Sequence, residues 1–311
     1  MLSRRNVRIK VMQMLYSLSK DESLKFEDLL TRYNSRINKS FQLYLFNLLY
    51  FLRITEYARN DAERKVSKFL PTDEDKQFTA KLCENELIQS LAENEKLHLL
   101  FKHYKLNELV DKDTVRLIYT EFAKKEEYRD YVMKKDTGEE DHREILLDLY
   151  KHCMQNENFE DKIEDHYAQW IDDQSLIVGA MKKTIKALPT EGDFFEEYRP
   201  NKETTLEFGE QLLRQVLEQD QELLDLIEPT LKNWDADRVA IIDMILLKMA
   251  LTELMTFPTI PSKVTINEFV EISKLYSTEK SKDFINGILD RLMKKLNKEG
   301  KIRKEGRGLL E

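Results

Sequence analysis

The sequence predicts an all-α protein, and the scarcity of turn-forming residues is the first observation behind that prediction. The 311 residues include only 8 glycines and 6 prolines, and no glycine precedes Gly138. Tight turns between strands depend on glycine, proline and asparagine, because these residues supply positive or fixed φ angles. A chain that has few of them and many Leu, Lys, Glu and Gln residues favours helices joined by short polar links.

The spacing of apolar residues is the second observation. Ile285, Ile288, Leu289, Leu292 and Leu296 follow the helical pattern i, i+3, i+4, i+7 and i+11, which is typical of a helix that faces a core. The dipeptide Asn286-Gly287 lies inside this stripe, although Asn-Gly is a strong turn former. Because the stripe continues on both sides, we interpret the segment as helical. We predict that Gly287 lets another helix approach closely, at a cost of about 1 kcal/mol relative to alanine, and that Asn286 presents its amide at the surface.

The remaining elements follow from the same criteria. The first helix is predicted to begin at Ser3, a suitable N-cap, and to bury Val7, Val11, Met14 and Leu18. Pro71 and Pro189 are predicted to end two later helices. In chain order, the predicted helices cover residues 3–20, 21–33, 39–70, 74–104, 111–133, 143–155, 164–188, 206–234, 235–258, 265–276 and 281–296.

The polar segment 189–205 is the clearest linker, and we place the main boundary of the chain in it. We therefore divide the chain into four parts. Residues 1–20 form an Arg-rich helix, 21–200 a helical insertion or diverged region, 201–297 a C-terminal helical region, and 298–311 a basic tail.

Charge is distributed unevenly along the chain. The net charge is −8, yet the first 20 residues contain five basic residues and no acidic ones, and eight basic residues against three acidic ones follow from Arg291 onward. An acidic protein with two basic ends is suited to binding a polyanion at one place.

Several classes of protein and site lack support. No apolar run reaches the roughly 18 residues of a membrane span, and the N-terminal segment has no apolar core of a secretory signal. Cys83 and Cys153 form no CxxC or Cys/His pattern, and the five histidines form no metal-binding pattern. We find no nucleotide-binding loop or hydrolase motif. We expect a cytoplasmic, non-enzymatic protein without cofactor or metal.

The candidate binding residues begin with Arg4, Arg5 and Arg8 in the first turns of the first helix. Basic side chains face the positive end of the helix dipole there, so their presence indicates a use outside folding, such as contact with phosphates. The alternative, a solvated basic start that only aids solubility, stays open. Tyr16 falls on the same side and could stack on an unpaired base, or could simply be a packing residue.

Two separated parts of the chain, its opening and a C-terminal region, contain motifs that resemble those of one bacterial protein family. The opening RRNVRIKVMQMLYSL resembles the family's Arg-rich first helix, which ends in Leu-Tyr. The segment Pro261–Glu268 resembles its Pro-x-x-Val-x-Ile-Asn-Glu motif and follows an apolar helix that closes with Glu253-Leu254. Ser281–Asp290 resembles Ser-x-x-Phe-Val-Asn-Gly-Val-Leu-Asp, with isoleucine at 285 and 288. Together these segments resemble the NusB family of bacterial transcription antitermination factors, and the resemblance covers residues 3–20 and 204–297.

The resemblance implies an all-helical fold of two packed sub-bundles. It further implies binding to single-stranded boxA RNA of nascent rRNA together with NusE, a ribosomal small-subunit protein, in the elongating RNA polymerase complex. Asn6 departs from the family's usual third basic residue, and Lys280 stands where an acidic residue is common. The residues that the resemblance assigns to RNA contact are Arg4, Arg5, Arg8, Tyr16, Lys280, Lys282, Phe284 and Asn286.

A second hypothesis is a helical scaffold that binds only proteins, because no motif explains the long acidic region between the two matched parts. For the basic tail, a role beside the RNA surface and a disordered, solubilising end are both open.

Overall fold

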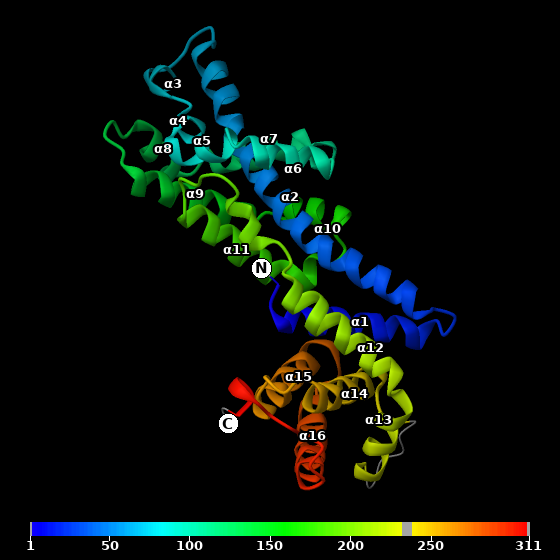
Figure 1. The fold of residues 1–311 in the computed structure, drawn as a ribbon. Coiled ribbons are helices and arrows are strands. Elements are labelled where there is room, and N and C mark those ends of the chain that lie inside the picture. Colours follow the sequence, from blue (N-terminus) through cyan, green and yellow to red (C-terminus); the bar gives the residue numbers. More distant parts are fainter. Residues whose placement is uncertain (1, 232–237, 310–311) are drawn as a thin grey trace. The chain divides into compact units, whose positions relative to one another are not determined.

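A computed structural model describes residues 2–231 and 238–309, and those residues form helices and turns without any strand (Figure 1). The predicted all-α fold is confirmed. Within the described residues, no helix is both long and apolar enough to cross a membrane.

The chain folds into two compact units. The central unit comprises residues 38–199, and the terminal unit comprises residues 2–37 and 200–311. Helix α2, Phe26–Val66, contributes to both units, with its first residues in the terminal unit and the rest in the central one.

The central unit surrounds the later part of α2 with short helices. Its other α-helices are α3 (Asp73–Gln77), α4 (Lys81–Glu84), α5 (Glu86–Ala92), α6 (Glu95–His103), α7 (Lys112–Phe122), α8 (Glu126–Met133), α9 (Glu139–Cys153), α10 (Glu157–His166) and α11 (Trp170–Lys186). Two 3₁₀ segments, Leu106–Glu108 and Phe194–Tyr198, complete it.

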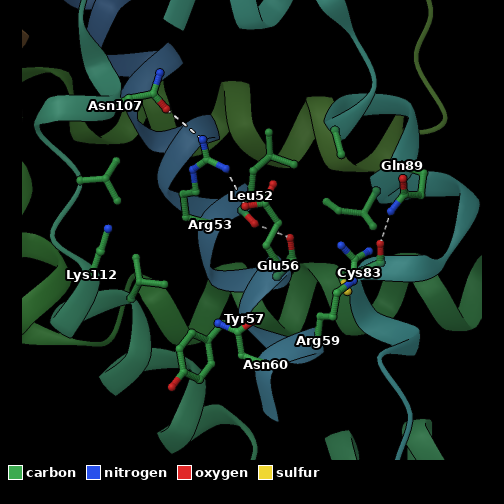
Figure 2. A pocket seen from close by; sticks show the side chains of 15 residues that line it. Leu52, Arg53, Glu56, Tyr57, Arg59, Asn60, Cys83, Gln89, Asn107 and Lys112 are labelled. Atoms are coloured by element: carbon green, nitrogen blue, oxygen red, sulfur yellow. Dashed lines mark hydrogen bonds and ion pairs between the residues drawn. The ribbon is translucent and has the colours of Figure 1, made fainter. Parts of the chain in front are cut away.

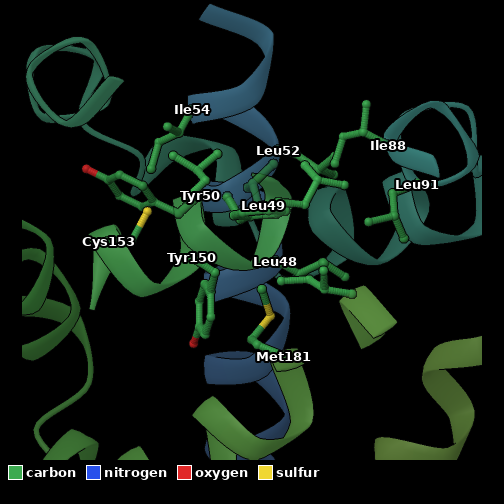
Figure 3. Close-up of a cluster of buried hydrophobic side chains, with 14 of the residues drawn as sticks. Leu48, Leu49, Tyr50, Leu52, Ile54, Ile88, Leu91, Tyr150, Cys153 and Met181 are labelled. Carbon is green, nitrogen blue, oxygen red and sulfur yellow. The ribbon is translucent and has the colours of Figure 1, made fainter. Parts of the chain in front are cut away.

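The core of the central unit lies along α2. Leu48, Leu49 and Leu52 of this helix meet Ile88 of α5, Tyr150 of α9 and Met181 of α11 in one apolar cluster (Figure 3). Every α2 residue from 43 to 52 is buried, as expected for a helix that is covered on all sides.

The predicted boundaries within residues 21–133 are wrong in three ways, one of which is that residues 111–133 form two helices, α7 and α8. Residues 21–33 and 39–70 do not form separate helices, because no glycine or proline interrupts them and α2 runs through for 41 residues. Residues 74–104, predicted as one helix, break into four. Asn85 and Asn94 cause two of the breaks, since their side chains accept hydrogen bonds from the backbone amides of Ile88 at 3.1 Å and Leu97 at 2.9 Å. These asparagines are N-caps that start new helices.

The terminal unit is built around α14, Ile241–Thr256, which packs against α1, α12, α13, α15 and α16. These partners are α1 (Arg4–Lys20), α12 (Gln211–Glu218), α13 (Asp220–Ile227), α15 (Ser262–Tyr276) and α16 (Ser281–Lys298). A π-helical segment, Glu203–Glu210, precedes α12, and 3₁₀ turns cover Glu228–Thr230 and Gly306–Leu309. The predicted helix 206–234 therefore divides into several segments, and residues 232–234 of it lie outside the described residues.

Helix α1 begins as predicted. The Ser3 hydroxyl accepts a hydrogen bond from the backbone amide of Asn6 at 3.3 Å, and the Asn6 side chain accepts one from the Ser3 amide at 3.2 Å. This reciprocal capping satisfies two backbone donors at the start of the helix. It also gives a folding role to Asn6, where the NusB family usually has a basic residue.

The segment around Gly287 is helical, as predicted, but the proposed reason for the glycine is wrong. Among the described residues, a Cβ atom at Gly287 would meet no heavy atom within 4 Å, so no neighbouring helix approaches it. The close approach occurs instead at Gly209 in the π-helical segment. A Cβ atom there would overlap the Tyr33 hydroxyl and the Val7 side chain.

Candidate nucleic-acid interface

The three arginines at the start of α1 each meet a carboxylate. The Nη2 of Arg4 lies 3.1 Å from Oε1 of Glu203. Arg5 donates two parallel hydrogen bonds to Glu268, from Nε at 2.7 Å and from Nη2 at 2.8 Å. These bonds raise the pKa of the Arg5 guanidinium above its ordinary value. The side chains of Arg4 and Arg5 are still 40% and 48% exposed.

Arg8 differs from its two neighbours because it is buried. Its Nε and Nη2 both donate to Glu253 at 2.7 Å, and the two side chains are only 2% and 0% exposed. The Thr265 hydroxyl also donates to Oε1 of Glu253 at 2.7 Å. The guanidinium carbon lies 5.1 Å from the centroid of the Phe208 ring and 5.7 Å from that of Phe269.

This arrangement changes the interpretation of the basic cluster. Arg8 was expected at the RNA surface, but its guanidinium is enclosed between a buried carboxylate and two aromatic rings and joins α1 to α14 and α15. The unfavourable position of three cations at the helix N-terminus is offset by three glutamates, which come from the π-helical segment, α14 and α15. Only Arg4 and Arg5 retain surface that a ligand can reach.

A second buried carboxylate, Asp243, fixes the other candidate segment. Ser277 donates to its Oδ1 at 2.6 Å, and Ser281 donates to its Oδ2 at 2.7 Å. These bonds tie the start of α16 to the first turn of α14. Lys280 and Lys282 on either side of Ser281 are exposed, and neither has a carboxylate partner within the described part of the chain.

The remaining predicted residues lie on α1 and α16. Asn286 is exposed and Phe284 is half-buried. Tyr16 is 38% exposed, and Nζ of Lys20 lies 5.3 Å from the centroid of its ring. The residue before Tyr16, Leu15, lines a hollow together with Met244 near the start of α14.

The predicted residues thus fall into two groups along α14. Arg8 is held at Glu253 and the start of α16 is held at Asp243, ten positions earlier. Ten residues of α-helix span about 15 Å. The structure therefore presents an arginine group near the end of α14 and a lysine group near its start.

Further exposed cations follow on α16. Arg291, Lys295 and Lys298 have no carboxylate partner among the described residues, and together with Lys294 they line a shallow hollow. The sequence analysis identified these residues only as part of the basic C-terminal segment. Their helical spacing from Phe284 places them on its side of α16, a pattern that was available in the sequence.

The basic tail is attached to the terminal unit as far as the described residues extend. Nζ of Lys304 donates to the Phe257 carbonyl at 3.1 Å, and the Glu305 amide donates to the Pro258 carbonyl at 3.0 Å. Burial lowers the pKa of the Lys304 ammonium group. The tail therefore lies at the end of α14 that also carries Glu253, while Arg303 and Arg307 remain exposed.

Comparisons with known proteins identify the family. A sequence model of the NusB family matches residues 140–294. The transcription antitermination protein NusB of Salinibacter ruber is 42% identical over 107 residues, which are 34% of this chain and 67% of that protein. The NusB protein of Geobacter sulfurreducens is 41% identical over 105 residues, covering 34% of this chain and 76% of the relative.

A third relative, the NusB protein of Chloroherpeton thalassium, is 39% identical over 100 residues, which are 32% of this chain and 47% of that protein. No solved structure is detectably similar to the chain. The family match begins at residue 140, inside the central unit, so the assignment of each segment to the family fold stays a prediction. Because more than two thirds of a relative is matched at 41% identity, the chain belongs to the NusB family.

Proposed function

We propose that this chain is a transcription antitermination protein that binds single-stranded boxA RNA of nascent rRNA. In this proposal it acts with NusE in the elongating RNA polymerase complex in the cytoplasm. The observation that carries the proposal is the 41–42% identity to proteins named for transcription antitermination. The exposed cations of the terminal unit supply the chemistry that such a role requires.

RNA contacts in this proposal come mainly from the lysine group. Lys280 and Lys282 are exposed and lack carboxylate partners among the described residues, so they can neutralise phosphates without first breaking an ion pair. The Asn286 amide can hydrogen-bond to a base edge, and the rings of Tyr16 and Phe284 can stack on unpaired bases.

Arg4 and Arg5 join the surface at a cost. Each must give up its glutamate partner to bind a phosphate. The free energy gained is small, because one charge-assisted hydrogen bond replaces another of similar strength. Arg8 contributes indirectly, because its buried pair with Glu253 fixes the position of α1. We therefore propose a structural role for Arg8 in place of direct contact.

Salt-dependent RNA binding tests this surface. The affinity of the full chain for a boxA-type single-stranded RNA, measured by fluorescence anisotropy between 50 and 300 mM salt (about the range in which such slopes are resolved), reports the number of phosphates neutralised. Each contact to a single strand contributes about 0.7 to the log–log slope. The double variant Lys280→Ala/Lys282→Ala should therefore lower the slope by about 1.4.

A matched control is Lys182→Ala, which removes an exposed cation of α11 in the central unit. It should leave the slope unchanged. An equal loss in both variants would show that RNA contacts the protein through its general charge and would contradict the proposed surface. Adding purified NusE should increase the affinity for boxA RNA but not for a scrambled strand.

The alternative function, a scaffold that binds proteins without RNA, is favoured by one observation: residues 1–139 lie outside the family match. Capture of NusE by the full chain in the absence of any RNA affinity would support it. Read-through of a terminator by RNA polymerase, dependent on boxA and on the chain, would support antitermination.

A further inference from the structure

The central unit contains a large hollow that the RNA surface does not use. It has a volume of about 790 Å³ and lies between α2, the α4–α5 segment and the start of α7 (Figure 2). Its lining residues fall between positions 52 and 115, before the start of the family match at residue 140. Cavities of 300–1,000 Å³ with apolar walls and a few polar groups are typical of small-molecule sites.

The floor of the hollow is apolar and buried. Leu52 and Ile88 are each 1% exposed, and Val115 is 6% exposed. Leu52 and Ile88 also belong to the core cluster of the central unit (Figure 3). These residues fix the base of the hollow, and the apolar surface that a ligand can reach comes from Tyr57, Ala92 and Val110, which are half-buried and pack against the same core.

The rim of the hollow is positively charged. Arg53 is already engaged, because its Nη1 lies 2.6 Å from Oε2 of Glu56 and its Nη2 donates to Oδ1 of Asn107 at 2.9 Å. Arg59 and Lys112, in contrast, are exposed and have no carboxylate partner among the residues described. Three cations face one carboxylate, so the lining carries a net charge of about +2.

Two further side-chain amides line the hollow. Asn60 follows Arg59 on α2, and Gln89 lies on α5, where its amide group donates to the Cys83 carbonyl. Figure 2 shows Arg59 beside Cys83, and Lys112 on the other side of the view. A guanidinium group suits a phosphate, because it donates in a planar fork.

We propose that this hollow binds a nucleoside monophosphate. The phosphate dianion pairs with Arg59 and matches the excess of two positive charges. The base and sugar lie over Tyr57, Ala92 and Val110. Lys112 attracts the anion at longer range and donates to a polar edge of the base.

Calorimetric titration of the full chain with AMP, GMP, CMP and UMP tests the proposal. At least one of these should bind with a dissociation constant below about 1 mM, whereas adenosine and inorganic phosphate, each lacking half of the recognised groups, should bind at least tenfold more weakly. Arg59→Gln should weaken the nucleotide at least tenfold, and Lys112→Gln by a smaller factor.

Matched variants separate the site from general charge and from the RNA surface. Arg116→Gln removes an exposed cation of α7 that does not line the hollow, and it should not change nucleotide affinity. Ala92→Phe fills the hollow from α5 and should abolish binding without lowering the melting temperature. Lys280→Ala/Lys282→Ala should affect RNA binding alone.

The proposal is overturned if none of the four nucleotides binds below about 1 mM. It is equally overturned if Arg59→Gln and Arg116→Gln reduce the affinity by the same factor, or if adenosine binds as tightly as its monophosphate. Because the hollow and the RNA-contact residues belong to different compact units, each of these failures leaves the antitermination proposal untouched.

Discussion

The buried pair of Arg8 and Glu253 gives the sharpest prediction about this protein. Arg8→Ala leaves the Glu253 carboxylate, which is 0% exposed, with the Thr265 hydroxyl at 2.7 Å as its one remaining side-chain donor among the described residues. The substitution also removes the guanidinium from between the rings of Phe208 and Phe269. The expected result is a large loss of stability in the terminal unit.

The magnitude follows from burial. Removing one partner of a buried ion pair costs about 3–5 kcal/mol, because the remaining charge is uncompensated. Arg5→Ala removes a pair of similar geometry, with distances of 2.7 and 2.8 Å, but the Arg5 side chain is 48% exposed. A surface pair of that kind contributes about 0.2–1 kcal/mol. The two substitutions should therefore differ by at least 2 kcal/mol or so.

Native-state hydrogen exchange is the suitable assay, because it reports opening free energies element by element. Amides of α1, α14 and α15 should lose protection strongly in Arg8→Ala and little in Arg5→Ala, while those of α9 and α11 in the central unit should keep theirs. The double variant Arg8→Met/Glu253→Met should recover most of the loss, since removing both charges leaves no unpaired ion.

Two outcomes would refute this reasoning. If Arg8→Ala lowered the free energy of unfolding by less than about 1 kcal/mol, the pair would contribute no more than an exposed ion pair does. A double variant as unstable as the single one would show that packing, and not the orphaned carboxylate, causes the loss.

Three further predictions follow. Gly287→Ala should raise stability by about 1 kcal/mol in urea unfolding, because a Cβ atom meets nothing within 4 Å in the described structure; a loss of stability would contradict the open environment. Gly209→Ala should cost about 1–3 kcal/mol in the same measurement, through overlap with buried Tyr33, and a neutral effect would mean that Tyr33 moves aside freely. Burial lowers the pKa of His142 below its ordinary value of 6.5. The contribution of neutral His142 to stability is therefore complete above pH 6.5 and declines as the pH falls from there towards the folded-state pKa. His142→Gln should reduce the pH dependence of the melting temperature over that interval, and an unchanged pH dependence would contradict the assignment.

The helices were predictable from sequence where their apolar residues repeat with one period and a cap is local. Ser3 could be identified as the N-cap of α1 because its partner, Asn6, is three residues away. The helix through Gly287 could be identified because the apolar stripe continues past it. The breaks at Asn85 and Asn94 carried the same kind of local signature, an asparagine before glutamate, and could have been found.

The roles of the candidate site residues were less accessible. Arg5 and Arg8 are close in sequence, and each donates two hydrogen bonds to a different glutamate. Arg5 is nevertheless about half-exposed, whereas Arg8 is buried. Periodicity places Arg8 beside the apolar face of α1, but it cannot show that the Glu253 carboxylate packs against that position. The absence of a carboxylate partner for Lys280 and Lys282 could likewise not be predicted, because acidic residues are nearby in the sequence. The structure shows that, among the described residues, none of these acidic side chains pairs with either lysine.

The helical class, the capping of the first helix and the family could be predicted without a structure, because they depend on composition, short-range spacing and motif identity. Which cations are available to a ligand depends on contacts between distant parts of the chain. The partners of Arg5 and Arg8 lie 263 and 245 residues away along the chain. Whether a charge is neutralised or free depends on what the fold brings within a few ångströms of it, and its sequence neighbours do not determine that.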